Sequence, residues 1–124
     1  MSRPTILYVE DNELNRKLVR DLLRRTSYRL LEAVDGEAGV QMALAERPGL
    51  ILMDVQLPKL SGVEATRRLR ADPVTAATPI IAITSFALSG DDQRARDAGA
   101  SAYLPKPFSP FTLLGMIRKL LPEA

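Results

Sequence analysis

The sequence alternates between short apolar runs and longer stretches of helical periodicity, and this alternation restricts the fold more than any other feature. Apolar runs of four to eight residues, partly β-branched, predict strands, and such runs, some of them shorter, cover residues 5–9, 29–34, 50–53, 80–83 and 102–104. Apolar side chains three or four positions apart predict helices. This periodicity covers residues 14–23 and 113–121. Helices are also expected over 37–46, which is rich in small residues, over 63–70 after the break at Ser61-Gly62, and over the polar stretch 91–98, which ends at Gly99.

A strand followed by a helix, repeated five times, is typical of one fold class. It implies a parallel sheet with helices on both faces, joined by right-handed crossovers. We therefore expect an α/β fold, specifically a flavodoxin-like (βα)5 doubly wound sheet with strand order 2-1-3-4-5. The 124 residues are expected to form one domain, 1–124, with nothing appended.

The chain has no cysteine and no histidine, which narrows its possible chemistry. Disulfides, thiol nucleophiles, thiolate zinc sites and histidine general bases are all excluded. Carboxylates, hydroxyls, lysine or a hard metal ion must carry any reaction. No apolar run is long enough to cross a bilayer and the N-terminus has no signal-peptide pattern, so we expect a cytoplasmic protein without a membrane partner.

The charges do not indicate a nucleic-acid partner. Basic residues cluster at 66–70 and at Arg24 and Arg25, but 15 acidic residues are interspersed with the 17 basic ones. Helices with solvated charges explain these clusters better than a nucleic-acid surface does.

Polar residues follow the predicted strands at the end where α/β sheets bind ligands. Glu10 and Asp11 follow the first strand, Asp54 the third, Thr84 the fourth and Lys106 the fifth. Carboxylates that converge repel one another, and Mg²⁺, which prefers oxygen ligands, relieves that repulsion. With a lysine and a hydroxyl beside them, these groups are suited to phosphoryl transfer with a carboxylate as nucleophile.

Each residue alone has a simpler structural explanation. Asp11 or Asn12 could cap the following helix, and Asp54 could be a loop or capping residue. Thr84 could be structural and Lys106 a solvated charge. The convergence of four strand ends on one edge favours a site.

Several segments together resemble the bacterial response-regulator receiver domain, and the resemblance covers essentially the whole chain. They are listed in chain order: Glu10-Asp11, LILMD ending at Asp54, Gln56-Leu57-Pro58 with Gly62, Thr84, and Lys106-Pro107. The segments VEDNELNRKL and LILMDVQLP further resemble single-domain DivK-type cell-division regulators and the receiver domains of hybrid histidine kinases.

The resemblance implies that Asp54 accepts a phosphoryl group from a histidine kinase or histidine phosphotransfer protein. It also implies that Asp11, Asp54, the backbone carbonyl of Gln56 and Glu10, the last either directly or through water, bind Mg²⁺. Thr84 and Lys106 would contact the phosphoryl oxygens. Tyr103 corresponds to the switch aromatic, and the Lys106–Pro107 peptide is expected to be cis. Ser85 and Leu57 depart from the commonest family residues, alanine and methionine, without removing a functional group.

The resemblance also gives expectations about the surface that binds the kinase and about how the signal is passed on. The kinase is expected to dock on the first helix, at Leu14, Asn15 and Leu18, and on the loop 107–110. Residues 86–98 contain few large apolar side chains, which suits a moving element. About 18 residues follow Lys106, so we expect no output domain and a signal passed by contact with a downstream protein.

Three alternatives remain at this point. The chain could be a kinase-binding adaptor of the same fold that is never phosphorylated, or a receiver domain excised from a hybrid kinase. An aspartyl-phosphate phosphatase of the haloacid dehalogenase type is disfavoured, because that family has Asp-x-Asp at the nucleophile and Gln56 occupies the second acidic position here.

Overall fold

The computed structural model describes residues 3–84 and 91–123 and contains strands and helices in the predicted alternation. The strands are β1 (Thr5–Val9), β2 (Arg29–Ala33), β3 (Leu50–Asp54), β4 (Ile80–Thr84) and β5 (Ala102–Pro105). The helices are α1 (Glu13–Leu23), α2 (Gly36–Glu46), α3 (Gly62–Ala71), α4 (Asp91–Ala98) and α5 (Pro110–Leu120).

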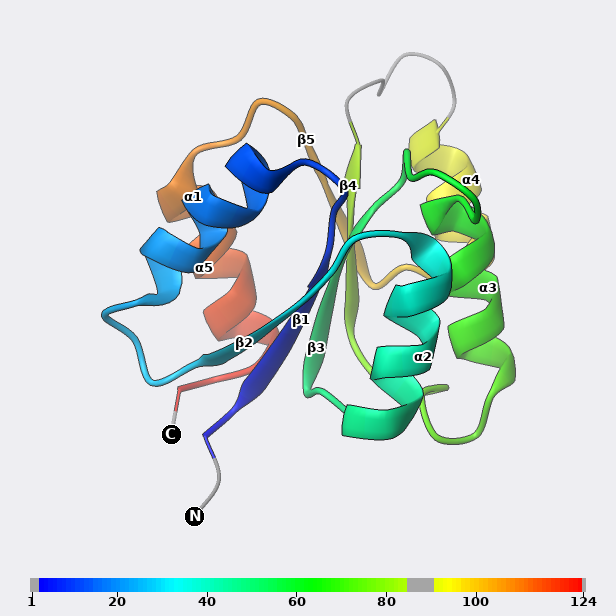
Figure 1. The fold of residues 1–124 in the computed structure, drawn as a ribbon, viewed down its shortest axis with the longest axis horizontal. Coiled ribbons are helices and arrows are strands. Elements are labelled where there is room, and N and C mark those ends of the chain that lie inside the picture. Colours follow the sequence, from blue (N-terminus) through cyan, green and yellow to red (C-terminus); the bar gives the residue numbers. More distant parts are fainter. Residues whose placement is uncertain (1–2, 85–90, 124) are drawn as a thin grey trace.

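The strands form one parallel sheet in the order β2-β1-β3-β4-β5, which confirms the predicted topology. Figure 1 shows α1 and α5 on one face of this sheet and α2, α3 and α4 on the other. The order reverses direction between β1 and β3, the point where ligands bind in folds of this kind.

Alternating side chains of β1 supply the two sides of the core. Ile6 and Tyr8 join the cluster beneath α1 and α5, whereas Leu7 and Val9 join the cluster beneath α2 and α3. Every residue of β3 and β4 is buried, as expected of central strands covered on both faces. The sheet is thereby a rigid base for the side chains at its carboxyl end.

The structure differs from the predicted element ends in small ways. The second strand ends at Ala33, and Val34 is 52% exposed. The reason is that Asp35 caps α2, its side chain accepting a hydrogen bond from the Ala38 backbone N–H at 2.8 Å. In α1 the buried face is formed by Val19 and Leu23.

Ser85 and residues 86–90, which include part of the expected moving segment, lie outside the described residues. Among the residues that are described, no helix has both the length and the apolar character needed to cross a membrane.

Candidate metal centre and its surroundings

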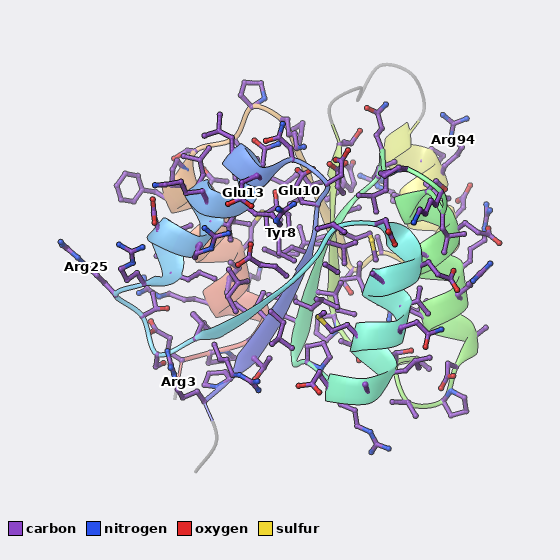
Figure 2. The ribbon with its side chains drawn as sticks, in the orientation of Figure 1. Arg3, Tyr8, Glu10, Glu13, Arg25 and Arg94 are labelled. Atoms are coloured by element: carbon purple, nitrogen blue, oxygen red, sulfur yellow. The ribbon has the colours of Figure 1, made fainter. Side chains whose placement is uncertain are left out.

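The residues predicted to form a site do lie at one edge of the sheet. Asp54 and Thr84 are the last residues of β3 and β4, and Glu10 and Lys106 directly follow β1 and β5. The register aligns these strand ends, with Val9 opposite Met53 and Thr84 opposite Pro105. Glu10 is visible at the upper end of the sheet in Figure 2.

Three carboxylates are grouped closely enough to share a metal ion. One oxygen each from Glu10, Asp11 and Asp54 lies within 4.8 Å of the other two. Glu10 and Asp54 are only 1% and 4% exposed, whereas Asp11 faces solvent. An all-oxygen, partly open donor set of this kind fits Mg²⁺, which keeps several water ligands.

Lys106 bridges the two buried carboxylates. Its Nζ donates to Glu10 Oε1 at 2.9 Å and to Asp54 Oδ2 at 3.1 Å. The Lys106–Pro107 peptide is cis, as the resemblance implied. The ammonium group therefore neutralises part of the negative charge at the point where the carboxylates meet.

The pKa values show how strongly the buried acids interact. Burial, together with hydrogen bonding to Glu10 and its charge, raises the pKa of Asp54 to about 7. Burial would also raise the pKa of Glu10, but hydrogen bonds with Asp54 and Lys106 lower it to about 2. Burial opposes the charge of Lys106, yet contacts with both acids raise its pKa. Without a cation, Glu10 is thus the ionised partner and Asp54 the one that holds a proton more readily.

The other predicted residues surround this cluster. The Gln56 backbone N–H donates to Asp54 Oδ1 at 2.9 Å, which fixes the β3–α3 turn against the acid. Thr84 is 1% exposed, and its carbonyl accepts from the Lys106 N–H at 2.7 Å. Tyr103 is half-buried beside α4, and the Arg96 guanidinium lies 4.3 Å from its ring centroid.

A second set of contacts around Glu10 was not foreseen from the sequence. Its side chain accepts hydrogen bonds from the Tyr8 hydroxyl and the Asn15 amide, and its carbonyl accepts one from Arg16 at 2.8 Å. The strand period of two places Tyr8 and Glu10 on the same face of the sheet. The strand period was the one sequence feature that could have predicted this contact, because Tyr8 otherwise resembles the other apolar residues of its strand.

An apolar groove of about 480 Å³ opens beside the cluster, between α1 and the start of α5. Its lining includes two residues expected to contact a kinase, Asn15 and Leu18, together with Pro107 of the β5–α5 loop and Pro110, the first residue of α5. Leu18, which lines the groove, is 61% exposed, and Leu14, one helical turn earlier in α1, is 65% exposed. These leucines belong to the predicted stripe of the first helix, but they face outward.

Four arginines of the basic clusters noted in the sequence form contacts within the molecule. Arg24, Arg67 and Arg68 form ion pairs with Asp21, Glu64 and Glu37. Arg70 instead donates to the carbonyl oxygens of Thr75, Thr78 and Gly99.

Comparison with known proteins gives a consistent result. The response regulator receiver domain family matches residues 6–118. The polar-differentiation response regulator DivK of Brucella anthropi is 42% identical over 120 residues, which is 97% of this chain and 98% of that protein. DivK of Brucella ovis is 41% identical over the same shares.

Solved structures agree with this assignment. The receiver domain of a Pseudomonas aeruginosa sensor histidine kinase, with a magnesium ion coordinated in its active site cleft, is 39% identical with a TM-score of 0.88, over 94% of this chain and 96% of that one. The chemotaxis response regulator CheY4 of Vibrio cholerae is 30% identical with a TM-score of 0.87, over 94% and 98%. The acidic cluster of Glu10, Asp11 and Asp54 is typical of receiver magnesium sites. This chain belongs to the response regulator receiver domain family, whose members are phosphoacceptor signalling proteins and not enzymes in the usual sense.

Proposed function

We propose that this protein is a phosphorylation-dependent switch in which Asp54 accepts a phosphoryl group from a partner histidine kinase or histidine phosphotransfer protein. The observation that carries the proposal is the buried Asp54, held by Lys106 within a cluster of three oxygen ligands at the carboxyl end of the sheet. Membership of the receiver family implies the kinase partner.

In the proposed reaction an Asp54 carboxylate oxygen attacks phosphorus. The bond from phosphorus to the imidazole nitrogen of the partner breaks as the new oxygen–phosphorus bond forms, and the imidazole leaves with the electron pair and takes a proton from solvent. Such a transfer requires positioning and neutralisation of charge more than covalent catalysis. Lys106 and the Thr84 hydroxyl are the groups we assign to the phosphoryl oxygens.

We assign Glu10, Asp11, Asp54 and the backbone carbonyl of Gln56 as the residues that hold Mg²⁺. When bound, the ion supplies positive charge to the phosphoryl oxygens and favours the ionised form of Asp54. Bound Mg²⁺ would thus explain how Asp54, whose pKa is raised to about 7 in the metal-free protein, can lose its proton and act as a nucleophile.

Phosphorylation would change contacts at the end of β4 and β5. A phosphoryl group brings about −1.5 to −2 charges and strong acceptor oxygens. Thr84 would move toward these oxygens, and Tyr103, which is half-buried against α4 here, would turn inward. The surface of α4, β5 and α5 would change with it and transmit the signal to a downstream protein.

We assign the apolar groove between α1 and the β5–α5 loop to the kinase. It adjoins the acidic cluster through Lys106, which lines it, so a bound partner could present its phosphohistidine to Asp54. The similarity to DivK over nearly the full length supports a role in polar differentiation or cell-division control.

Beryllofluoride, which mimics a phosphoryl group on aspartate, tests the switch. With Mg²⁺ present, it should shift the amide resonances of Thr84, Tyr103 and Lys106 in the wild-type protein, and Asp54→Asn should abolish these shifts. An unchanged wild-type spectrum would contradict the proposal. An adaptor that is not phosphorylated would keep its binding to a kinase in the Asp54→Asn variant and show no such shifts.

A further inference from the structure

We propose that Tyr8 is a positioning residue of the metal centre, whose hydroxyl fixes Glu10 so that the Oε2 atom of that carboxylate faces the cation. The inference rests on the proposed magnesium site and assigns a supporting role there to Tyr8, a residue of the hydrophobic core. Tyr8 itself contacts neither the metal nor the phosphoryl group in this account.

Tyr8 is buried at a place from which its hydroxyl reaches the Glu10 side chain. The residue is fully buried, with 0% exposure, in the cluster beneath α1 and α5. Its hydroxyl lies 3.2 Å from Glu10 Oε1. Figure 2 shows the two side chains together near the end of β1, on the side of α1.

The two oxygens of Glu10 have different environments. Oε1 accepts from the Tyr8 hydroxyl, from Asn15 Nδ2 at 3.1 Å and from Lys106 Nζ at 2.9 Å. Oε2 accepts from the Asn12 backbone N–H at 3.3 Å. A carboxylate oxygen offers about two lone pairs, so three donors occupy Oε1 and leave Oε2 as the metal-facing atom.

Tyr8 becomes more important once a phosphoryl group is present. In the proposed function Lys106 turns toward the phosphoryl oxygens, and Oε1 then loses its closest donor. The packed Tyr8 ring cannot follow that movement, so its hydroxyl continues to hold Glu10. A tyrosine hydroxyl carries its proton at neutral pH and can therefore donate.

The test compares two tyrosines that each lose one hydroxyl. Tyr8→Phe removes the donor to Glu10, and Tyr28→Phe removes a buried hydroxyl that donates to the Leu121 carbonyl, away from the acidic cluster. Mg²⁺ affinity is measured by calorimetry, and folding by thermal melting in EDTA. Groups that orient metal ligands typically affect affinity by about 10- to 100-fold, and we expect Tyr8→Phe to weaken Mg²⁺ binding about 10-fold.

The control separates positioning from general loosening of the core. Tyr28→Phe should change Mg²⁺ affinity less than about two-fold, although it also lowers the melting temperature, since each variant loses one hydrogen bond. Tyr8→Leu, a second variant without the hydroxyl, should also bind Mg²⁺ more weakly than wild type. Equal affinities in wild type and a folded Tyr8 variant would overturn the inference alone, whereas no Mg²⁺ binding by wild type would overturn the metal site and the inference with it.

Discussion

At the scale of single residues, the proposed chemistry depends on Lys106 and the acids that it contacts. The lysine reaches two buried carboxylates at once, at 2.9 and 3.1 Å, through the rotatable donors of a compact ammonium group. We therefore expect Lys106 to contribute to the site both through its positive charge and through the position of its three N–H donors relative to Asp54.

Lys106→Arg tests that distinction. The variant keeps the charge, but the planar guanidinium does not replace an ammonium point contact. We expect the amide shifts induced by beryllofluoride to be lost or much reduced, while the variant stays folded. Titration of both proteins with beryllofluoride and Mg²⁺ measures this, and a wild-type response from Lys106→Arg would show that the lysine does not contact the phosphoryl group.

Asp11 contributes an exposed negative charge to an already negative site. Burial and the Glu10 carboxylate raise the pKa of Asp11, so its charged form is disfavoured there without a cation. A like charge about 4 Å away costs about 1 kcal/mol in a water-like dielectric. Asp11→Asn should thus leave the metal-free free energy of unfolding unchanged or raise it by up to about 1 kcal/mol, and weaken Mg²⁺ binding.

Thermal melts with EDTA and with Mg²⁺ check both parts of this expectation. Wild type should gain stability from Mg²⁺, because a ligand that binds the folded state stabilises it, and Asp11→Asn should gain less. A clear fall in the metal-free melting temperature of the variant would count against repulsion as the main effect of Asp11.

At the scale of elements, the turn between β3 and α3 connects packing to chemistry. A Cβ atom on Gly62 would lie 1.9 Å from the Asp54 carbonyl oxygen and 2.7 Å from the Val55 Cα. Only glycine lets α3 approach β3 this closely. The backbone of the proposed phosphoacceptor is therefore held in place by the start of the next helix.

Gly62→Ala should disturb both stability and the site. We expect a loss of about 1–3 kcal/mol in the free energy of unfolding, as for other overpacked positions, together with slower phosphorylation of Asp54. Gly115→Ala on α5 is the matched control, since its Cβ would meet nothing within 4 Å. That variant should gain up to about 1 kcal/mol from helix propensity and react at the wild-type rate; normal phosphorylation of Gly62→Ala would refute the coupling.

The elements also show what a sequence can reveal. The alternation of apolar runs predicted the strand order and the meeting of Glu10, Asp54 and Lys106, because parallel topology leaves few choices for where strand ends lie. The ends of elements were less predictable: Val34 continues the apolar pattern of β2, but the cap at Asp35 ends the strand first. The hydroxyl of Tyr8 finds its partner only through tertiary packing, which the linear pattern does not contain.

For the whole molecule, the central question is how a partner reaches the buried acid. Leu18 lines the apolar groove and is 61% exposed, so it does not serve the core. Exposed apolar side chains that gather in a groove are typical of protein interaction sites. Lys106 lines the groove and also contacts the acidic cluster, so the proposed docking surface and the proposed phosphoacceptor site meet at one end of the sheet.

Leu18→Asp should separate docking from reactivity. We expect transfer from a phosphorylated histidine kinase that serves wild type to slow at least 10-fold, with phosphorylation by acetyl phosphate unchanged. Val74→Asp is the control, because Val74 is also exposed, at 42%, but does not line this groove. Equal transfer rates for wild type and Leu18→Asp would place the kinase elsewhere.

The most direct measurement is the intact mass of the protein after incubation with acetyl phosphate and Mg²⁺, for wild type and Asp54→Asn. We expect one phosphoryl adduct on wild type, lost when EDTA is present, and none on the variant. An adduct of equal yield on both proteins would contradict Asp54 as the acceptor. No adduct on wild type, together with no response to beryllofluoride, would contradict the phosphorylation switch itself.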